Sequence, residues 1–324
     1  MEDLSIVLES KRKTALFDQS NLQPGRYAGV PESDYFAATA VNASTLKHMG
    51  RSALHCKAEM TRSGDRPDTE AQKVGRLVHC AVLEPERFAA TYCRAPQVED
   101  HPDALTNHDS YKARAKDLGL KVGGSKSDLK ARILEAAPET EFWDDHLEQV
   151  MDGEREALKA DHWFLAQSII ESIATNDKAR KALSGGVAEE TLVWRDDQTG
   201  LLCKSRMDYY REDLGLIVDV KTTEDARPQA VARDIHKYGY HVSAAHYLDG
   251  LQALDLPGGQ SFAWVFVEKK APYAVGLYFA SAEMIDRGRE QQREYLTQFA
   301  RCKLSGIWPG YANEFQTIDL PAWA

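Results

Sequence analysis

The pattern of apolar and polar positions divides the chain into helical segments and one strand-rich region. Between residues 187 and 280, short apolar runs rich in valine, leucine and aromatic residues alternate with polar turns. Such runs are typical of β-strands, and one segment with helical spacing interrupts them. The pattern predicts strands over residues 187–197, 200–210, 215–223, 261–270 and 273–280, with a helix over 238–254.

Helices are expected before and after this region. The segment 41–60 begins with Asn42 and Ser44, two residue types that cap helices. The segment 69–88 carries an apolar stripe at helical spacing, and Pro85 marks where that helix ends or bends. The remaining expectations are a charged final helix at 281–304, an uninterrupted helical stretch at 146–183 and an irregular start at 1–40.

The order of these elements indicates an α/β (α+β) fold with a mixed central sheet flanked by helices. A polar linker at 96–110 leads into a segment that predicts two short helices around a Gly-Gly turn, with enough apolar residues for a small core. We therefore expect three parts. These are an N-terminal helical part (1–110), a small helical insert (111–137), and a core that holds the sheet and the C-terminal helix (138–324).

Composition and charge narrow the function classes. The chain has 324 residues, of which 43% are hydrophobic, and its formal net charge is −10. An acidic chain of this kind does not coat nucleic acid by bulk electrostatics, so a DNA-related role needs a local basic surface or metal ions held by carboxylates. No apolar run is long enough for a membrane span, and no secretory signal is expected. The five cysteines are scattered without a C-x-x-C pair, which argues against a disulfide framework or cysteine-bound zinc and favours a cytoplasmic protein.

One candidate site lies in the stretch GLIVDVKTTED. Asp219 and Lys221 project to the same side of their strand, because strand residues alternate between faces. A short turn links this strand to the preceding one, so that Asp208 can lie beside Asp219. Two carboxylates so placed repel each other unless a cation lies between them, and oxygen donors without cysteine favour Mg²⁺ or Mn²⁺. The alternative is that the aspartates end their strands and Lys221 extends to solvent.

The motif KSRMDYY…LIVDVKTT resembles the core of the PDDEXK nuclease superfamily. Together with VNASTLKHMGRSALHCKAEM, GRLVHCAVLEPERF and IVDVKTTEDARPQAVARDIHKYGYHVSAAHYLDG, it looks like the phage-type RecE (exonuclease VIII) domain family, over roughly residues 35–95 and 160–300. The resemblance implies that His79, Asp208 and Asp219 hold two Mg²⁺ or Mn²⁺ ions. It also implies that Lys221 is the catalytic lysine.

The same resemblance implies further site residues. Tyr247 matches the tyrosine of a Gln-x-x-x-Tyr motif, whose glutamine position is Ser243 here; both residues lie on one helix face, and packing of that helix against the sheet is the alternative. In related exonucleases an N-terminal serine and basic residues hold the DNA 5′ end, which makes Ser44 and Arg76 candidate phosphate contacts. Glu190, on the strand before Asp208, is a further candidate near the metal, or else a solvated strand end.

The insert is similar to a SAP motif, a small helical DNA-binding element with the pattern Gly-Leu…Gly-x-Lys-x-x-Leu-x-x-Arg. The basic positions Lys121, Lys126 and Arg132 give local positive charge that contacts to a DNA backbone require. The alternative is a solvated helical hairpin.

The function implied by the resemblance is a metal-dependent 5′→3′ exodeoxyribonuclease on linear double-stranded DNA, which leaves 3′ single-stranded tails for homologous recombination. Expected partners are DNA ends, further copies of the chain in a ring, and a single-strand-annealing recombinase, in the cytoplasm of a bacterial host if the gene belongs to a phage. A nuclease with an iron–sulfur cluster would need four suitably placed cysteines, which the chain lacks. A PDDEXK-type endonuclease and a non-catalytic DNA-end-binding recombination accessory protein stay open as alternatives.

Overall fold

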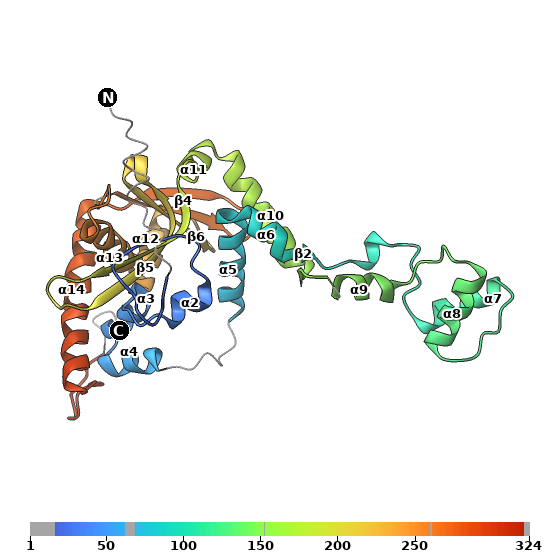
Figure 1. Cartoon of the computed structure of the whole chain (residues 1–324), viewed down its shortest axis with the longest axis horizontal. Helices are drawn as coiled ribbons and strands as arrows, with labels where there is room; N and C mark the ends of the chain where they lie inside the picture. Colours follow the sequence, from blue (N-terminus) through green and yellow to red (C-terminus); the bar gives the residue numbers. More distant parts are fainter. Residues whose placement is uncertain (1–16, 62–68, 152, 260, 321–324) are drawn as a thin grey trace. The chain divides into compact units, whose positions relative to one another are not determined.

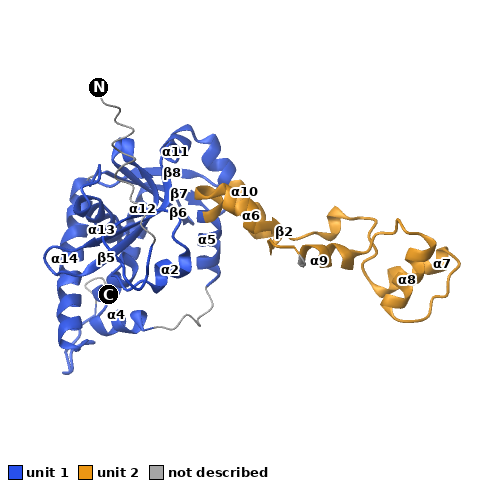
Figure 2. Cartoon of the chain, in the orientation of Figure 1, with its two compact units in different colours: residues 1–79, 169–324 blue, residues 80–168 orange. Residues whose placement is uncertain are grey.

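The computed structural model describes residues 17–61, 69–151, 153–259 and 261–320. Its contacts divide the chain into two units (Figure 2). Unit 1 comprises residues 1–79 and 169–324, and unit 2 comprises residues 80–168. The expected insert, 111–137, is one part of unit 2. No helix of the described segments is long and apolar enough to cross a membrane.

Unit 1 is built on a six-stranded sheet with the order β1-β4-β5-β6-β7-β8 (Figure 1). Neighbouring strands run antiparallel except for β6 and β7, which are parallel, so the sheet is mixed as expected. The predicted strands are confirmed within a few residues at each end. The strands are β1 (Gly25–Tyr27), β4 (Val187–Arg195), β5 (Leu202–Arg211), β6 (Leu216–Thr223), β7 (Ser261–Glu268) and β8 (Val275–Phe279).

Helices surround this sheet (Figure 1). The most deeply buried is α13 (Tyr240–Ala253), which packs against β4, β5 and β7 and against the long C-terminal helix α14 (Ala282–Ser305). Gly288 of α14 permits this close packing, because a Cβ there would lie 2.3 Å from the carbonyl oxygen of His241. The other helices with residues in unit 1 are α2 (Glu32–Ala37), α3 (Ala43–Lys47), η1 (His48–Gly50), α4 (Ala53–Met60), α5 (Glu70–Leu83), α10 (Ala160–Thr175), α11 (Asp177–Ala182), η3 (Glu212–Leu214) and α12 (Pro228–Tyr238).

Unit 2 contains the expected helical hairpin. Its helices α7 (His108–Asp117) and α8 (Lys126–Ala136) begin at Asn107 and Ser125, whose side chains accept hydrogen bonds from the third residue of each helix. A small core joins them, made by Tyr111, Ala115, Leu129, Ile133 and Phe142. The rest of the unit consists of α6 (Pro85–Thr91), β2 (Tyr92–Arg94), η2 (Val98–Asp100), α9 (Trp143–Met151), β3 (Glu156–Leu158) and the first half of α10.

Four expectations about local structure were wrong or incomplete. Residues 41–60 are not one helix, because α3, η1 and α4 follow one another and Ser52 caps α4 separately. Residues 1–40 are not irregular throughout, because β1 and α2 lie within them. Residues 146–183 are not uninterrupted helix, because β3 pairs in parallel with β2. Strands β1, β2 and β3 have three residues each, which is too short for the alternation of apolar and polar positions to be visible in the sequence. Helix α12 was not expected; Pro228 opens it and its apolar face is buried against the core.

Candidate active site

The centre of the candidate site lies where β5 and β6 diverge. Tyr209 pairs with Val218, and the next residue outward on each strand is Asp208 and Asp219. Asp208 remains attached to the neighbouring strand, because its Oδ2 accepts a hydrogen bond of 2.9 Å from the backbone N–H of Val220. The register of two antiparallel strands therefore brings two aspartates from separate segments to one position.

Lys221 lies on the same face of β6 as Asp219, as strand alternation predicts. Its Nζ is 2.5 Å from Oδ2 of Asp219 and 3.7 Å from Oδ2 of Asp208. Both aspartates are buried, with 5% and 8% of their surface exposed. Burying three charged side chains in an apolar strand pair destabilises the fold unless the charges compensate one another. Their burial together therefore favours a catalytic role over the alternative that they merely end their strands.

His79 and Glu189 complete the cluster. Nδ1 of His79, on α5, is 3.5 Å from Oδ2 of Asp208. Glu189, on β4, joins them so that one ligand atom each from His79, Glu189 and Asp208 lie within 4.8 Å of one another. Glu189 has a φ of 52°, the left-handed region that a non-glycine residue seldom adopts. Strained backbone of this kind is retained where the surrounding structure requires it, commonly at functional sites.

Glu190 is not at the cluster. Its carboxylate is buried and forms a two-point ion pair with the guanidinium of Arg26, at 2.8 Å and 3.1 Å. Successive strand residues face opposite sides of a sheet, so when Glu189 reaches the cluster, Glu190 points away from it. The structure thus brings Glu189, and not Glu190, to the cluster.

The charges of the cluster shift one another's ionisation. Burial and the nearby charge of Asp208 raise the pKa of Asp219 to about 6, although Lys221 opposes the shift. For Lys221, burial alone lowers the pKa, but the two aspartates outweigh it and the pKa lies above the ordinary value. Lys221 therefore stays protonated at neutral pH.

The donors fit a hard divalent cation. Oδ2 of Asp219 is buried, and its ion-pair partner is Nζ of Lys221. The cluster has three carboxylates: Lys221 contacts the two aspartates, and Nε of Arg206 lies 4.0 Å from Oε2 of Glu189. Carboxylate oxygens with one imidazole nitrogen are donors that Mg²⁺ and Mn²⁺ accept. The residues able to hold such an ion are His79, Glu189, Asp208 and Asp219.

A second lysine beside the site was not found from the sequence. Lys47, the last residue of α3, donates a hydrogen bond of 3.0 Å to the carbonyl of Tyr238. Its Nζ lies 5.7 Å from the ring centre of Tyr240, and Nζ of Lys221 lies 5.5 Å from the same ring. Burial and the charge of Lys221 lower the pKa of Lys47 to about 8. Lys47 follows Ser44 by one helical turn, and this spacing is the signal that could have identified it.

Tyr247 and Ser243 lie on α13, next to the sheet. Burial raises the pKa of Tyr247 well above its ordinary value, and the charges of Asp219 and Asp208 add to the shift. The Tyr247 ring packs against the main core, so the packing role considered for it is present. Ser243 is half-buried on the same helix.

The two candidate phosphate contacts are on the surface. Ser44 is exposed in the first turn of α3, and the cap of that helix is Asn42, whose Oδ1 accepts a 2.8 Å hydrogen bond from the N–H of Thr45. Ser44 is therefore not required as a cap. Arg76 is exposed on α5, one turn before His79.

The basic residues of the hairpin, in unit 2, differ in their surroundings. Lys126 pairs with Asp144 at 2.8 Å. Arg132 donates to the carbonyls of Lys121 and Gly123 and so closes the glycine-containing turn. Lys121 is exposed. Two of the three cations thus have structural partners, and Lys121 is the most available to a ligand.

Comparisons with known proteins concern the family and the fold. A family model described as "PDDEXK-like domain of unknown function (DUF3799)" matches residues 129–321. A crystal structure of a Eubacterium rectale protein described as a candidate exonuclease matches with a TM-score of 0.52 and 13% identity, over 90% of this chain and 96% of that chain. This similarity shows a shared fold.

A phage-related exonuclease from Haemophilus somnus 129PT matches with a TM-score of 0.27 and 13% identity, over 64% of this chain and 100% of that chain. No curated protein matches the chain.

Proposed function

The chain belongs to the family of PDDEXK-like domains of unknown function (DUF3799), and we propose that it is a metal-dependent exodeoxyribonuclease that degrades one strand of linear double-stranded DNA. The observation that carries the proposal is the contact of Lys221 with two buried aspartates from adjacent strands, beside His79 and Glu189. The three carboxylates and the imidazole can hold a metal ion. Lys221 can contact the phosphate of the DNA and the attacking water.

Different residues would bind the metal ions, orient the attacking water and position the lysine. The chemistry that divalent ions supply at such a site is activation of a water and neutralisation of charge on the phosphate and the leaving 3′ oxygen. His79, Glu189, Asp208 and Asp219 would hold these ions. Lys221, kept protonated by the aspartates, would orient the attacking water and stabilise the developing negative charge on the phosphate. Tyr247 and Ser243 would support the lysine strand from α13.

Polarity and product are part of the proposal. We infer degradation in the 5′→3′ direction, with the 5′ phosphate held by Ser44, Arg76 and Lys47. Support for this assignment is that Ser44 is not the helix cap and that Lys47 lies beside the same tyrosine ring as Lys221. The product would be a duplex with a 3′ single-stranded tail, suited to a single-strand-annealing recombinase.

The remaining parts of the proposal concern assembly and DNA contact. A homo-oligomeric ring around DNA would reconcile an acidic chain with a nucleic-acid substrate, since basic side chains can line a channel while the outer surface stays acidic. The SAP-like hairpin would contact the DNA backbone through Lys121, with Lys126 and Arg132 holding the hairpin's shape. If the gene belongs to a phage or prophage, the protein would act in the cytoplasm of the bacterial host.

The test compares substrates and variants in one assay. Linear duplex with a 5′ or a 3′ label, 5′-phosphorylated or not, is incubated with Mg²⁺ or with chelator, beside closed circular duplex. We expect Mg²⁺-dependent release of the 5′ label from linear DNA and no cleavage of circles. Lys221→Met and Asp219→Asn should each reduce the rate by about 10²- to 10⁴-fold. Asp213→Asn, on the turn between the same strands and half-exposed, is the matched control.

Each alternative has its own outcome. Cleavage of closed circles would replace the exonuclease proposal with an endonuclease. Tight binding to DNA ends without cleavage under any metal would replace it with a DNA-end-binding accessory protein. Full activity in both Lys221→Met and Asp219→Asn would overturn the assignment of the site.

A further inference from the structure

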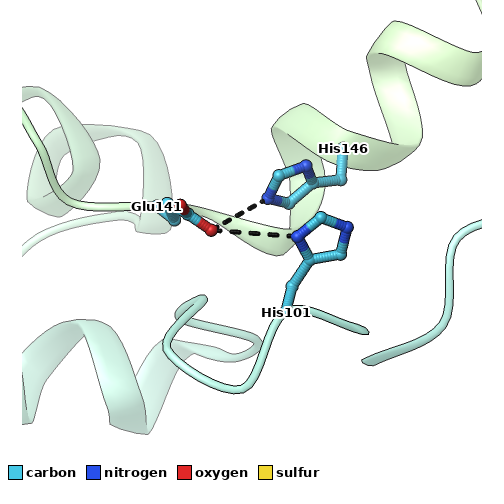
Figure 3. Close-up of side chains that lie close together, drawn as sticks. All are labelled: His101, Glu141 and His146. Carbon is cyan, nitrogen blue, oxygen red and sulfur yellow. Dashed lines mark ion pairs between the residues drawn. The ribbon is translucent and has the colours of Figure 1, made fainter. Parts of the chain in front are cut away.

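A second cluster of potential metal ligands lies in unit 2, in residues that no DNA-related role uses. It consists of His101, Glu141 and His146 (Figure 3). Oε2 of Glu141 lies 3.4 Å from Nε2 of His146 and 3.8 Å from Nδ1 of His101. Both histidine nitrogens therefore point at the same carboxylate oxygen.

The distance between Glu141 and His146 fits two metal ligands better than a hydrogen bond. An N–H···O hydrogen bond joins its heavy atoms at about 2.7–3.2 Å, so both distances are too long. Ligands about 2.0–2.1 Å from a tetrahedral ion lie roughly 3.3–3.4 Å from one another, which the Glu141–His146 distance matches. Nε2 of His146 is buried without a hydrogen-bond partner among the described residues. This nitrogen can therefore donate its electron pair to a metal ion bound in the cluster.

Backbone hydrogen bonds hold His101 and Glu141 in place. Leu105 and Phe142 form a parallel bridge, in which the N–H of Leu105 donates to the carbonyl of Glu141 at 2.9 Å and the N–H of Trp143 donates to the carbonyl of Leu105 at 3.0 Å. The N–H of Ala104 donates to the carbonyl of His101 at 3.0 Å, which ties that histidine to the same bridge. Two segments far apart in sequence are thus joined immediately beside the ligands.

Aromatic side chains surround the two histidine rings. The imidazoles of His101 and His146 stack at 3.6 Å between centres, and the ring of Trp143 lies 6.2 Å and 6.3 Å from them. Glu141 is exposed, which leaves the carboxylate side open to an entering ion.

We propose that His101, Glu141 and His146 form a binding site for a divalent transition metal, with zinc as the best fit. Two imidazole nitrogens and one carboxylate oxygen are ligands that zinc accepts. Mg²⁺ prefers oxygen ligands and suits this set less well. Three protein ligands leave a fourth position for water. The proposal is independent of the nuclease assignment, because it uses none of the residues of that site.

The position of the ligands gives the ion a structural role. The segment between His101 and Glu141 contains both helices of the hairpin, and Phe142, next to Glu141, belongs to the hairpin's core. A bound ion would close this segment into a loop and so restrict its unfolded ensemble. Zinc would therefore stabilise the SAP-like hairpin.

Zinc binding to the full-length protein in excess Mg²⁺ tests the proposal. The metal-free protein is titrated with Zn²⁺, and bound zinc is measured by calorimetry and by elemental analysis. Wild-type protein should bind one equivalent more than Glu141→Gln or His146→Gln. The matched controls are Glu139→Gln and His108→Gln, which remove the same residue types elsewhere in unit 2 and should bind as much zinc as the wild type.

A second measurement separates a site from general loss of structure. Zn²⁺ should slow hydrogen exchange across residues 101–146 in the wild type and leave His146→Gln unchanged, while circular dichroism of the two metal-free proteins is the same. The Co²⁺-loaded wild type should show the visible absorption of a tetrahedral site, and His101→Gln should lose it. Equal zinc stoichiometry in wild type and His146→Gln, or an equal loss in His108→Gln, would overturn the proposal.

Discussion

His246 should limit the stability of the protein in mild acid. It lies on α13, fully buried, where Nε2 donates a 3.1 Å hydrogen bond to the carbonyl of Lys204 and the ring packs against Trp194 at 4.7 Å between centres. Burial lowers the pKa of His246 from 6.5 to about 4. The unfolded chain therefore takes up a proton at pH values where the folded protein does not. The contribution of His246 to the free energy of unfolding is therefore fully present above pH 6.5 and is lost as the pH falls toward 4.

The size of the effect follows from the shift. A change of one pKa unit corresponds to about 1.4 kcal/mol. The shift from 6.5 to about 4 therefore corresponds to a total loss of about 3 kcal/mol in the free energy of unfolding. Between pH 7 and pH 5 the wild type should lose about 2 kcal/mol through this group. His246→Gln keeps a donor for the Lys204 carbonyl but cannot take up a proton, and it should not show this loss.

Urea unfolding at pH 7 and pH 5, followed by circular dichroism, gives the free energies of unfolding. Other groups also titrate in this range, so the measured quantity is the pH-dependent loss in the wild type minus that in His246→Gln. His236→Gln is the control, because it removes an exposed histidine from the adjacent helix. If wild type and His246→Gln lose the same free energy between the two pH values, the reasoning from burial is refuted.

Three further predictions concern the candidate site and the hairpin. Glu189→Gln should weaken metal-dependent cleavage about 10²-fold or more with little change in stability, because its carboxylate belongs to the cluster. Glu190→Gln should have the reverse effect and cost about 1–3 kcal/mol in urea unfolding, because buried Arg26 then loses its two-point partner and keeps the ion pair with the partly exposed Glu212. Lys47→Met should lower kcat/KM on 5′-phosphorylated ends by about 10- to 100-fold and affect unphosphorylated ends less, the loss of one charged phosphate contact. Lys121→Ala should reduce the slope of log K against log salt by about 1 in DNA-binding titrations, and an unchanged slope would contradict a backbone contact.

The sequence by itself determined the parts of this protein that depend on local periodicity. Alternation along β6 places Asp219 and Lys221 on one face, and the short turn before β6 brings Asp208 beside them. The apolar runs predicted the strands β4 to β8, because each is long enough for its burial pattern to repeat. The position of His79 followed from a resemblance, since a histidine on a helix has no local feature that identifies it as a ligand.

Only the tertiary structure decided the rest. Glu189 and Glu190 are adjacent and chemically alike, and the choice between them depends on a left-handed residue in β4 and on a partner, Arg26, from a distant strand. Lys47 became a candidate only when α3 packed beside the sheet and brought it to the ring that Lys221 also approaches.

The histidine–glutamate cluster shows the same limit. His101 and Glu141 are separated in sequence by an entire helical hairpin, and the backbone bridge between Leu105 and Phe142 brings them together. Periodicity reports which face of an element a residue occupies, and it says nothing of which other element that face meets. Contacts between distant segments depend on how the whole chain packs, and for this reason the second cluster could not be found from the sequence.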